Sequence, residues 1–261
     1  MKAKYIISRF VLILALIVAL GSCDEDFLTT VPTDAVTTDI AMSSTENMML
    51  ALNGIHRSMY AQNGYVGNYA GQQFMIPTAE YAASDALHSA LANGWHNSRL
   101  RWLMHTSATR TDLRFSWFYY YNIIGSVNNI INNSESLTMS DEFHNILGQA
   151  YTYRAWAHFE LVKNFCKAYM ICNPSTDLGV PIMLVTEPPY EGLERSTVEQ
   201  VYTQIKGDLT TAIGHFADAT PRVDLSDLNI DVANGIAARV YLTTGDWAQA
   251  ASFANAARQD Y

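Results

Sequence analysis

Cysteine is scarce in this sequence of 261 residues, with three copies in all. None of them belongs to a cysteine–histidine cluster with the spacing of a zinc site. Cys166 and Cys172 are close in the chain, so a disulfide between them would restrict little of the unfolded chain's entropy. We therefore expect two independent thiols, although an oxidising compartment would permit the bridge.

Motifs of catalysis are missing as well. The seven histidines are scattered, and none lies in a His-Glu-x-x-His pattern. No Gly-x-Ser-x-Gly elbow and no phosphate-binding glycine loop occurs. Glu80 and Asp85 could be imagined as the acid pair of a hydrolase, but helix capping and solvation explain both more simply. We expect a protein that is not an enzyme and that uses no cofactor and no metal.

Positive charge is also in short supply, with 16 lysines and arginines against 25 acidic residues. Residues 1–22 hold three of the basic residues and none of the acids, so the remaining chain has a formal charge of −12. Such a charge excludes nucleic acid as a partner and disfavours other acidic polymers. Neutral ligands such as sugars, and cationic peptides, are compatible with it.

The chain does contain one long apolar run, at its start. Lys2, Lys4 and Arg9 supply positive charge, and the run from Phe10 to Leu20 is unbroken. Small residues then lead to Cys23, which completes the three-part pattern of a secretory signal peptide. The run is about half as long as the ~20 residues that a membrane-spanning helix needs. We therefore expect export and not a transmembrane anchor.

The ending Leu20-Gly21-Ser22-Cys23 resembles the bacterial lipobox, in which the cysteine is acylated and becomes the first residue of the mature protein. Residues 1–22 are then a lipoprotein signal peptide, and the acyl chains on Cys23 suffice for stable anchoring. Asp24-Glu25-Asp26 follows at once, and acids there resemble the surface-export signal of Bacteroidetes-type lipoproteins. We expect a lipid-anchored outer-membrane protein that faces the cell exterior.

Residues 23–42 show no periodicity and many threonines, which is typical of a tether. Residues 43–261 show the periodicity of amphipathic helices. Leu178 to Val185 contains Pro181 and is expected to be extended, within one long irregular loop. Two capping boxes indicate helix starts, namely Ser43 with Glu46 and Ser196 with Glu199. Further helices are expected over about 72–86, 113–131, 140–167, 230–243 and 247–260.

Two places resemble the tetratricopeptide repeat, in which a helix with Leu-Gly-x-x-Tyr packs on a helix with spaced small residues. The first is Leu147-Gly148-x-x-Tyr151, with a partner helix that contains Ile205, Leu209 and Ala212. The second is Ala237-Ala238-x-x-Tyr241, followed by the turn Gly245-Asp246-Trp247 and by Ala250, Ala254 and Ala257. We expect an all-α fold, a tetratricopeptide-like helical-pair scaffold with one long irregular loop. Ordinary antiparallel helix pairs would give the same fold class.

Further motifs follow the lipobox in a fixed order, namely Trp117-x-x-Tyr120-Tyr121 with Asn128-Asn129, Tyr153-Arg154-Ala155, Gly179-Val180-Pro181-Ile182, Arg195-Ser196-Thr197-Val198, and Arg239-Val240-Tyr241 with Gly245-Asp246-Trp247. Their order and spacing resemble the SusD/RagB family of outer-membrane nutrient-binding lipoproteins. The resemblance covers essentially the whole mature chain.

The resemblance implies a protein that binds glycans, or oligopeptides, at the cell surface without catalysis. It implies a partner, a TonB-dependent β-barrel transporter of the SusC/RagA type, which the lipoprotein caps like a lid. Members of the family are about twice as long as this chain. We therefore expect residues 43–261 to be a SusD-like N-terminal helical region, with the C-terminal half absent. A helical-repeat scaffold lipoprotein that binds only other proteins is the alternative.

The candidate ligand site lies in an irregular polar stretch. An indole on a loop can stack on the apolar face of a sugar ring, and polar neighbours can bond the hydroxyls. Loops on a rigid scaffold usually carry such sites. Both tryptophans could instead pack beneath the loop, since tryptophan is highly buried on average. The expected ligand-binding residues are Trp95, His96, Asn97, Arg99 and Trp102.

Other prominent side chains are interpreted as structural. The helical spacing of Trp117, Tyr120 and Tyr121 favours the core over an aromatic binding arc, and Trp247 is assigned to the core as well. Arg154 lies on a largely apolar helix, which favours a buried ion pair. Its candidate partners are the carboxylates of Asp208 and Glu160.

Overall fold

All described residues of the computed structural model belong to one compact unit, Ala41–Tyr261. The expected signal peptide, the lipidation site Cys23 and most of the tether lie outside the described residues, so these assignments stay predictions. The structure describes residues 42–60, 71–83, 97–186, 192–221 and 225–258.

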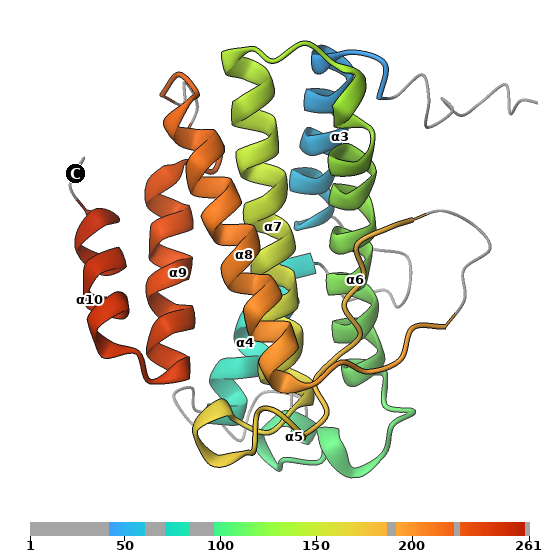
Figure 1. The fold of residues 1–261 in the computed structure, drawn as a ribbon. Helices are drawn as coiled ribbons and strands as arrows, with labels where there is room; N and C mark the ends of the chain where they lie inside the picture. Colours follow the sequence, from blue (N-terminus) through green and yellow to red (C-terminus); the bar gives the residue numbers. More distant parts are fainter. Residues whose placement is uncertain (1–41, 61–70, 84–96, 187–191, 222–224, 259–261) are drawn as a thin grey trace, which may run out of the picture. The chain divides into compact units, whose positions relative to one another are not determined.

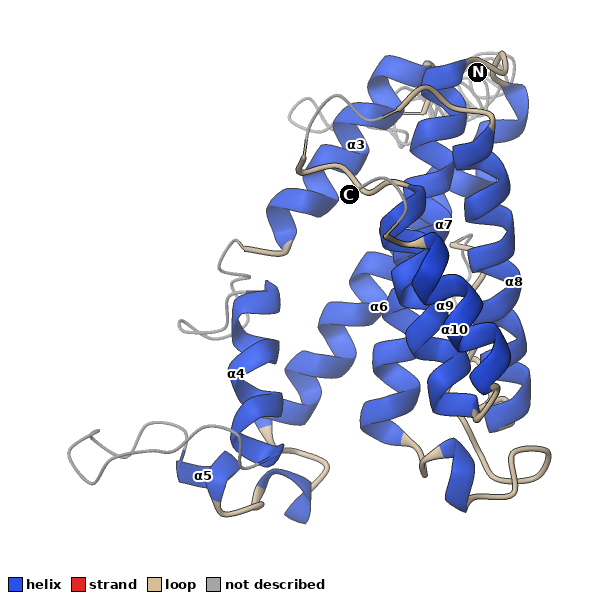
Figure 2. Ribbon diagram, turned by 90° about the vertical axis from the view of Figure 1, so that its left-hand side faces the viewer, coloured by secondary structure: helices blue, strands red, loops and turns tan. Residues whose placement is uncertain are grey.

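Every regular element in the described ranges is a helix, which confirms the all-α prediction (Figure 1, Figure 2). None of these helices is both long and apolar enough to cross a bilayer. The α-helices are α3 (Thr45–Ser58), α4 (Gly71–Ala83), α5 (Asn97–Leu100), α6 (Thr111–Asn132), α7 (Asp141–Phe165), α8 (Val198–Ala217), α9 (Ile230–Thr244) and α10 (Trp247–Ala256), and the 3-10 turns are η2 (Met104–Thr106), η3 (Ser134–Ser136) and η4 (Tyr169–Ile171).

Helices α6 to α10 lie side by side in chain order, and neighbours run in opposite directions (Figure 1). Helix α3 packs on both α6 and α7. Apolar side chains at helical spacing on α3, such as Met48, Leu52 and Ile55, are buried in this contact. The core therefore lies between α3, α6, α7 and α8.

Both predicted capping boxes are displaced by one residue. Helix α3 is capped by Ser44, whose hydroxyl accepts the backbone N–H of Asn47. Helix α8 is capped by Thr197, which exchanges reciprocal hydrogen bonds with Gln200. In each case the neighbouring residue can also cap a helix, so the residue pattern alone does not distinguish the two registers.

The tetratricopeptide-like pairing of α7 and α8 rests on a close approach at Gly148. A Cβ atom on Gly148 would lie 2.8 Å from the ring of Phe216 on α8. The chain turns between α9 and α10 at Gly245, whose φ of 79° favours glycine. Ala250 is buried, as expected for the small residue of a tetratricopeptide-like helix pair. Trp247 is exposed, so its assignment to the core was wrong: it begins α10, where its ring is left to solvent.

Arg154 lies in a buried network that joins α6, α7 and α8. Its guanidinium donates to both carboxylate oxygens of Asp208, at 2.9 and 2.6 Å, and to Asn128 at 3.1 Å. Burial raises the pKa of the Asp208 carboxyl, and the guanidinium opposes that effect. Asp208 was one of the two predicted partners. Removing one member of such a pair typically costs about 3–5 kcal/mol, because the other charge is left buried and unpaired.

The extended segment that includes Pro181 lies along α6. Tyr121 donates a hydrogen bond to the Pro181 carbonyl at 2.7 Å, and Asn128 donates to the carbonyl of Met183 at 2.9 Å. Asn132 donates to the carbonyl of Leu184 at 3.1 Å. Side chains of α6 therefore satisfy backbone carbonyls of this extended segment.

Candidate functional site

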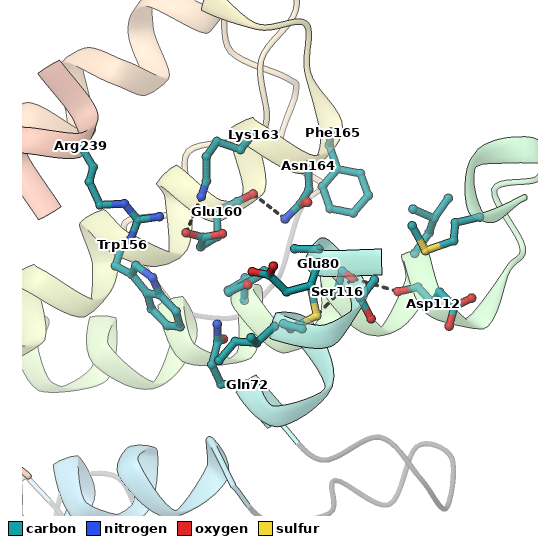
Figure 3. A pocket seen from close by; sticks show the side chains of 17 residues that line it. Gln72, Glu80, Asp112, Ser116, Trp156, Glu160, Lys163, Asn164, Phe165 and Arg239 are labelled. Atoms are coloured by element: carbon teal, nitrogen blue, oxygen red, sulfur yellow. Dashed lines mark hydrogen bonds and ion pairs between the residues drawn. The ribbon is translucent and has the colours of Figure 1, made fainter. Parts of the chain in front are cut away.

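A pocket of about 480 Å³ lies where α4, α6 and α7 meet, and Arg239 of α9 reaches it from the side (Figure 3). We call it the α4–α7 pocket. Its lining combines apolar, hydroxyl, amide and charged side chains, namely Gln72, Met75, Ile76, Thr78, Ala79, Glu80, Met104, Asp112, Leu113, Ser116, Tyr120, Trp156, Glu160, Lys163, Asn164, Phe165 and Arg239.

Helix α7 supplies one wall of this pocket. Trp156, Glu160 and Lys163 follow one another at helical spacing, so they share one face. The indole of Trp156 packs edge-on against Tyr120, with ring centroids 5.5 Å apart. Glu160 forms an ion pair with Lys163 at 2.7 Å. This wall therefore offers an aromatic ring beside fixed donors and acceptors.

Helix α4 supplies the facing wall. Figure 3 shows Gln72 and Glu80 on the opposite side from Trp156 and Glu160. Helix α4 is held on α6 by the edge-to-face contact of Phe74 with Phe115, at 5.2 Å between ring centroids. The amide and the carboxylate of α4 are thus held across the pocket from α7.

Tyr120 forms part of the floor and is almost fully buried. Burial raises the pKa of its phenol, and the carboxylate of Glu160 raises it further. The phenol therefore stays neutral at physiological pH. A neutral phenol can donate a hydrogen bond, which a ligand hydroxyl can accept.

Arg99 is the predicted site residue that the structure describes most fully. Its guanidinium is buried, forms an ion pair with Asp112 of α6 at 2.7 Å, and lies over the ring of Phe74 at 4.3 Å. Asp112 lines the α4–α7 pocket and Arg99 does not. Arg99 therefore joins α5 to the wall of the pocket, and its contact with a ligand stays a prediction.

The other predicted site residues lie beside or outside this region. Asn97 begins α5 and is exposed. The side chain of Trp102 is 56% exposed, and its φ of 54° is unusual for a residue with a side chain. Trp95 and His96 lie outside the described residues. Neither Asn97 nor Trp102 lines the α4–α7 pocket, and the grouping of the five residues into one ligand site stays a prediction.

A second hollow, of about 620 Å³, lies on the outer face of α6. Trp117 and Phe118 line it and are 37% and 41% exposed. Trp117 packs against Tyr121 and Phe165, with ring centroids 4.8 and 5.0 Å apart. We call it the aromatic groove; its lining is Ala108, Leu113, Arg114, Trp117, Phe118, Tyr121, Asn122 and Phe165.

The groove corrects one prediction. Tyr120 is in the core as expected, Tyr121 is partly buried, and Trp117 is at the surface. The buried side of α6 is centred on Phe115 and Tyr119 at this end, because α6 packs on neighbours at two sides. When a helix packs on neighbours at two sides, apolar residues at helical spacing do not show which of them lies at the centre of the buried face.

The structure bears on the catalytic and metal-binding residue types considered in the sequence only within the described residues. They contain no cluster of three or more histidine, cysteine or acidic side chains that could hold a metal ion. Glu80 lines the α4–α7 pocket, whereas Asp85 lies outside the described residues. Cys166 and Cys172 are free thiols, as predicted.

The sequence did carry a signal for the pocket that reasoning from it missed. Trp156, Glu160, Lys163 and Asn164 follow one another at helical spacing, so they lie on one side of α7. A tryptophan beside charged and amide groups on one helix face indicates a side that does not pack entirely into the core. The contributions of Gln72, Glu80 and Arg239 carry no comparable signal, because they come from helices far apart in the chain.

The fold and the pocket define a class, an all-α protein of antiparallel helix pairs with a polar, aromatic-lined pocket. The chain belongs to the SusD-like family, whose model matches residues 30–242 and is described as "Starch-binding associating with outer membrane". This confirms the resemblance noted in the sequence. No curated protein matches the chain significantly.

Solved structures show the same fold. A sugar-binding protein of Bacteroides vulgatus, described as putative, is 23% identical with a TM-score of 0.67, over 82% of this chain and 46% of its own. A SusD-like carbohydrate-binding protein of the same species is 22% identical with a TM-score of 0.66, over 84% and 46%. A SusD superfamily protein of Bacteroides thetaiotaomicron is 21% identical with a TM-score of 0.62, over 83% and 46%. The chain therefore spans less than half the length of these relatives.

Proposed function

We propose that this protein is a cell-surface lipoprotein that captures glycans for import through a TonB-dependent outer-membrane transporter. The observation that carries the proposal is the family match over residues 30–242, whose description names starch and the outer membrane. The lipobox with Cys23 and the acids that follow it support anchoring and outward orientation. The mechanism is recognition without bond breaking.

The composition of the α4–α7 pocket supports a glycan as the ligand. A sugar presents an apolar ring face and a rim of hydroxyls, each of which donates and accepts hydrogen bonds. The ring of Trp156 is suited to contact the apolar face of the sugar. The polar groups of Glu80, Gln72 and Asn164 are suited to hydrogen-bond its hydroxyls. A pocket with acidic, basic and amide groups together has no strong preference for a charged ligand. This agrees with a neutral sugar.

The test is calorimetric titration of the mature chain with malto-oligosaccharides, followed by a wider glycan panel and a peptide panel. Glu80→Ala should weaken binding roughly ten-fold, since a hydrogen bond to a charged group contributes about 1.5–3 kcal/mol. Glu142→Ala, an exposed acid on α7 outside the pocket, is the matched control. Equal affinities for the two variants would remove the pocket from the proposal, and turnover of a glycan would indicate a hydrolase.

The alternative, a scaffold that binds only other proteins, is favoured by one observation. The aromatic groove exposes Trp117 and Phe118 side by side on α6. Exposed aromatic clusters are typical of protein interfaces. The test of this alternative has two parts. No ligand in the glycan and peptide panels should bind, and a Phe118→Ser variant should lose a TonB-dependent transporter that co-purifies with the wild type. Both results together would support the scaffold.

A further inference from the structure

His144 and His215 form a close pair that the proposed function does not use. His144 lies in the first turns of α7, and His215 lies in the last turn of α8. Their Nδ1 atoms are 3.0 Å apart, and the ring centroids are 5.2 Å apart. Both side chains are half-buried. The pair therefore joins two helices and is still reached by solvent.

The two rings are held in place by their surroundings. Tyr151 stacks on His215 with ring planes 13° apart and centroids 5.8 Å apart. Helix α7 meets α8 closely one turn away, where Gly148 lies against the ring of Phe216. Neither helix can shift far without losing this contact. The separation of the two nitrogens is thus a property of the scaffold.

We propose that His144 and His215 bind a divalent transition-metal ion of the copper or nickel type through their Nδ1 atoms. A metal–imidazole bond is about 2.0–2.1 Å long, so two nitrogens about 3 Å apart subtend nearly a right angle at the metal. That angle suits the tetragonal geometry of Cu²⁺ and Ni²⁺ better than the tetrahedral geometry of Zn²⁺. Without a metal, one Nδ1–H donates a hydrogen bond to the other Nδ1.

The electrostatics at the pair agree with this assignment. Burial lowers the pKa of His215, and the neighbouring His144 lowers it further, against the opposite effect of Asp218. A lowered pKa favours the neutral form of the His215 imidazole, which is the form that binds a metal ion. Asp141 and Glu142, which precede His144, add negative charge to the same end of α7. The N-terminal dipole of α7 and the C-terminal dipole of α8 oppose each other.

The described residues hold no third histidine, cysteine or acidic ligand at this place, so water completes the coordination shell. Binding by two imidazoles is weaker than at a closed structural site. The ion would fasten the end of α7 to the end of α8. This inference stands independently of the glycan proposal.

The experiment uses the mature chain without an affinity tag. Titration with Ni²⁺ should show one binding event per chain, and His144→Gln or His215→Gln should each weaken it at least ten-fold. His88→Gln, which removes a histidine elsewhere in the sequence, is the control and should bind like the wild type. Unchanged affinity in both pair variants, or no binding of Ni²⁺ and Cu²⁺ to the wild type, would overturn the proposal.

A second readout does not depend on how the variants fold. Electron paramagnetic resonance of the wild-type Cu²⁺ complex should show hyperfine coupling to two imidazole nitrogens. A spectrum with sulfur ligands would assign the copper to Cys166 or Cys172 instead. A spectrum with no imidazole coupling would show that the pair is only a hydrogen bond.

Discussion

Exposure distinguishes three of the tryptophans that the structure describes. Trp156 is packed against Tyr120 and Tyr153 and lines the α4–α7 pocket. Trp102 and Trp247 are 56% and 62% exposed. Their rings contribute little to the core, and they can be replaced without a cavity.

Trp102→Ala should therefore leave the melting temperature nearly unchanged while weakening glycan binding, if this indole stacks on a sugar as predicted. Trp95→Ala is the companion variant, because the same stacking role is predicted for it. Trp247→Ala is the control, since it removes an equally exposed indole from α10. Equal glycan affinities for the Trp102 and Trp247 variants would contradict a role for Trp102 in binding.

His158 shows how burial lowers the pKa of a histidine side chain. Its side chain is fully buried, its Nδ1 donates to the carbonyl of Arg154 at 3.0 Å, and its Nε2 finds no partner among the described residues. Burial is the main cause that lowers its pKa from 6.5 to about 4. The folded protein therefore holds this imidazole neutral at pH values where the unfolded chain protonates it.

Stability should fall as the pH drops from 6.5 towards 4, because only the unfolded state binds the proton in that range. The contribution of His158 is up to about 3 kcal/mol. Urea unfolding of the wild type and of His158→Leu at pH 7 and pH 4.5 measures it. The wild type should lose more stability than the variant between the two pH values, and equal losses would count against a neutral buried imidazole.

At the scale of elements, the pair α7 and α8 tests the tetratricopeptide-like packing. Gly148→Ala should destabilise the protein by about 1–3 kcal/mol, because the new methyl group meets the ring of Phe216. Gly214→Ala on α8 is the matched control. It has open space around the new methyl group, so it should stabilise by about 0.5–1 kcal/mol. Thermal melting of both variants measures these changes in stability. A higher melting temperature for Gly148→Ala than for the wild type would contradict the close crossing of α7 and α8.

Helix ends and helix faces differ in how well local patterns predict them. Ser140, the predicted start of α7, caps it through a hydrogen bond to the backbone N–H of Phe143. The caps of α3 and α8 are displaced by one residue, because adjacent serine and threonine residues compete for the same role. The buried face of α6 was predicted correctly at Tyr120 and wrongly at Trp117. Its N-terminal half depends on neighbours that the helix's own sequence does not contain.

At the scale of the whole molecule, the proposed location depends on Cys23. Cys23→Ala should abolish acylation and release the protein from the outer membrane, because no lipid would then hold it. Membrane fractionation and mass spectrometry of the wild-type N-terminus measure this. An unmodified Cys23 in the wild type would contradict the lipoprotein assignment, whatever the fractionation of the variant shows.

The amino-acid sequence by itself determined the all-α class, the approximate helix spans, the buried pair of Arg154 with one of two carboxylates, and the family. These features depend on local periodicity and on the order of motifs along the chain. The signal peptide, the tether and the ligand loop at Trp95 and His96 stay predictions, since they lie outside the described residues.

Only the tertiary structure decided where the pocket lies and what Arg99 does. The α4–α7 pocket collects Gln72, Trp156 and Arg239 from three helices, and a pocket of this kind exists only after the helices have packed. Arg99 is predicted from the sequence to contact a ligand, and the structure adds that its guanidinium pairs with Asp112 and lies over the ring of Phe74. Contacts between distant segments are set by packing, and local patterns do not encode them.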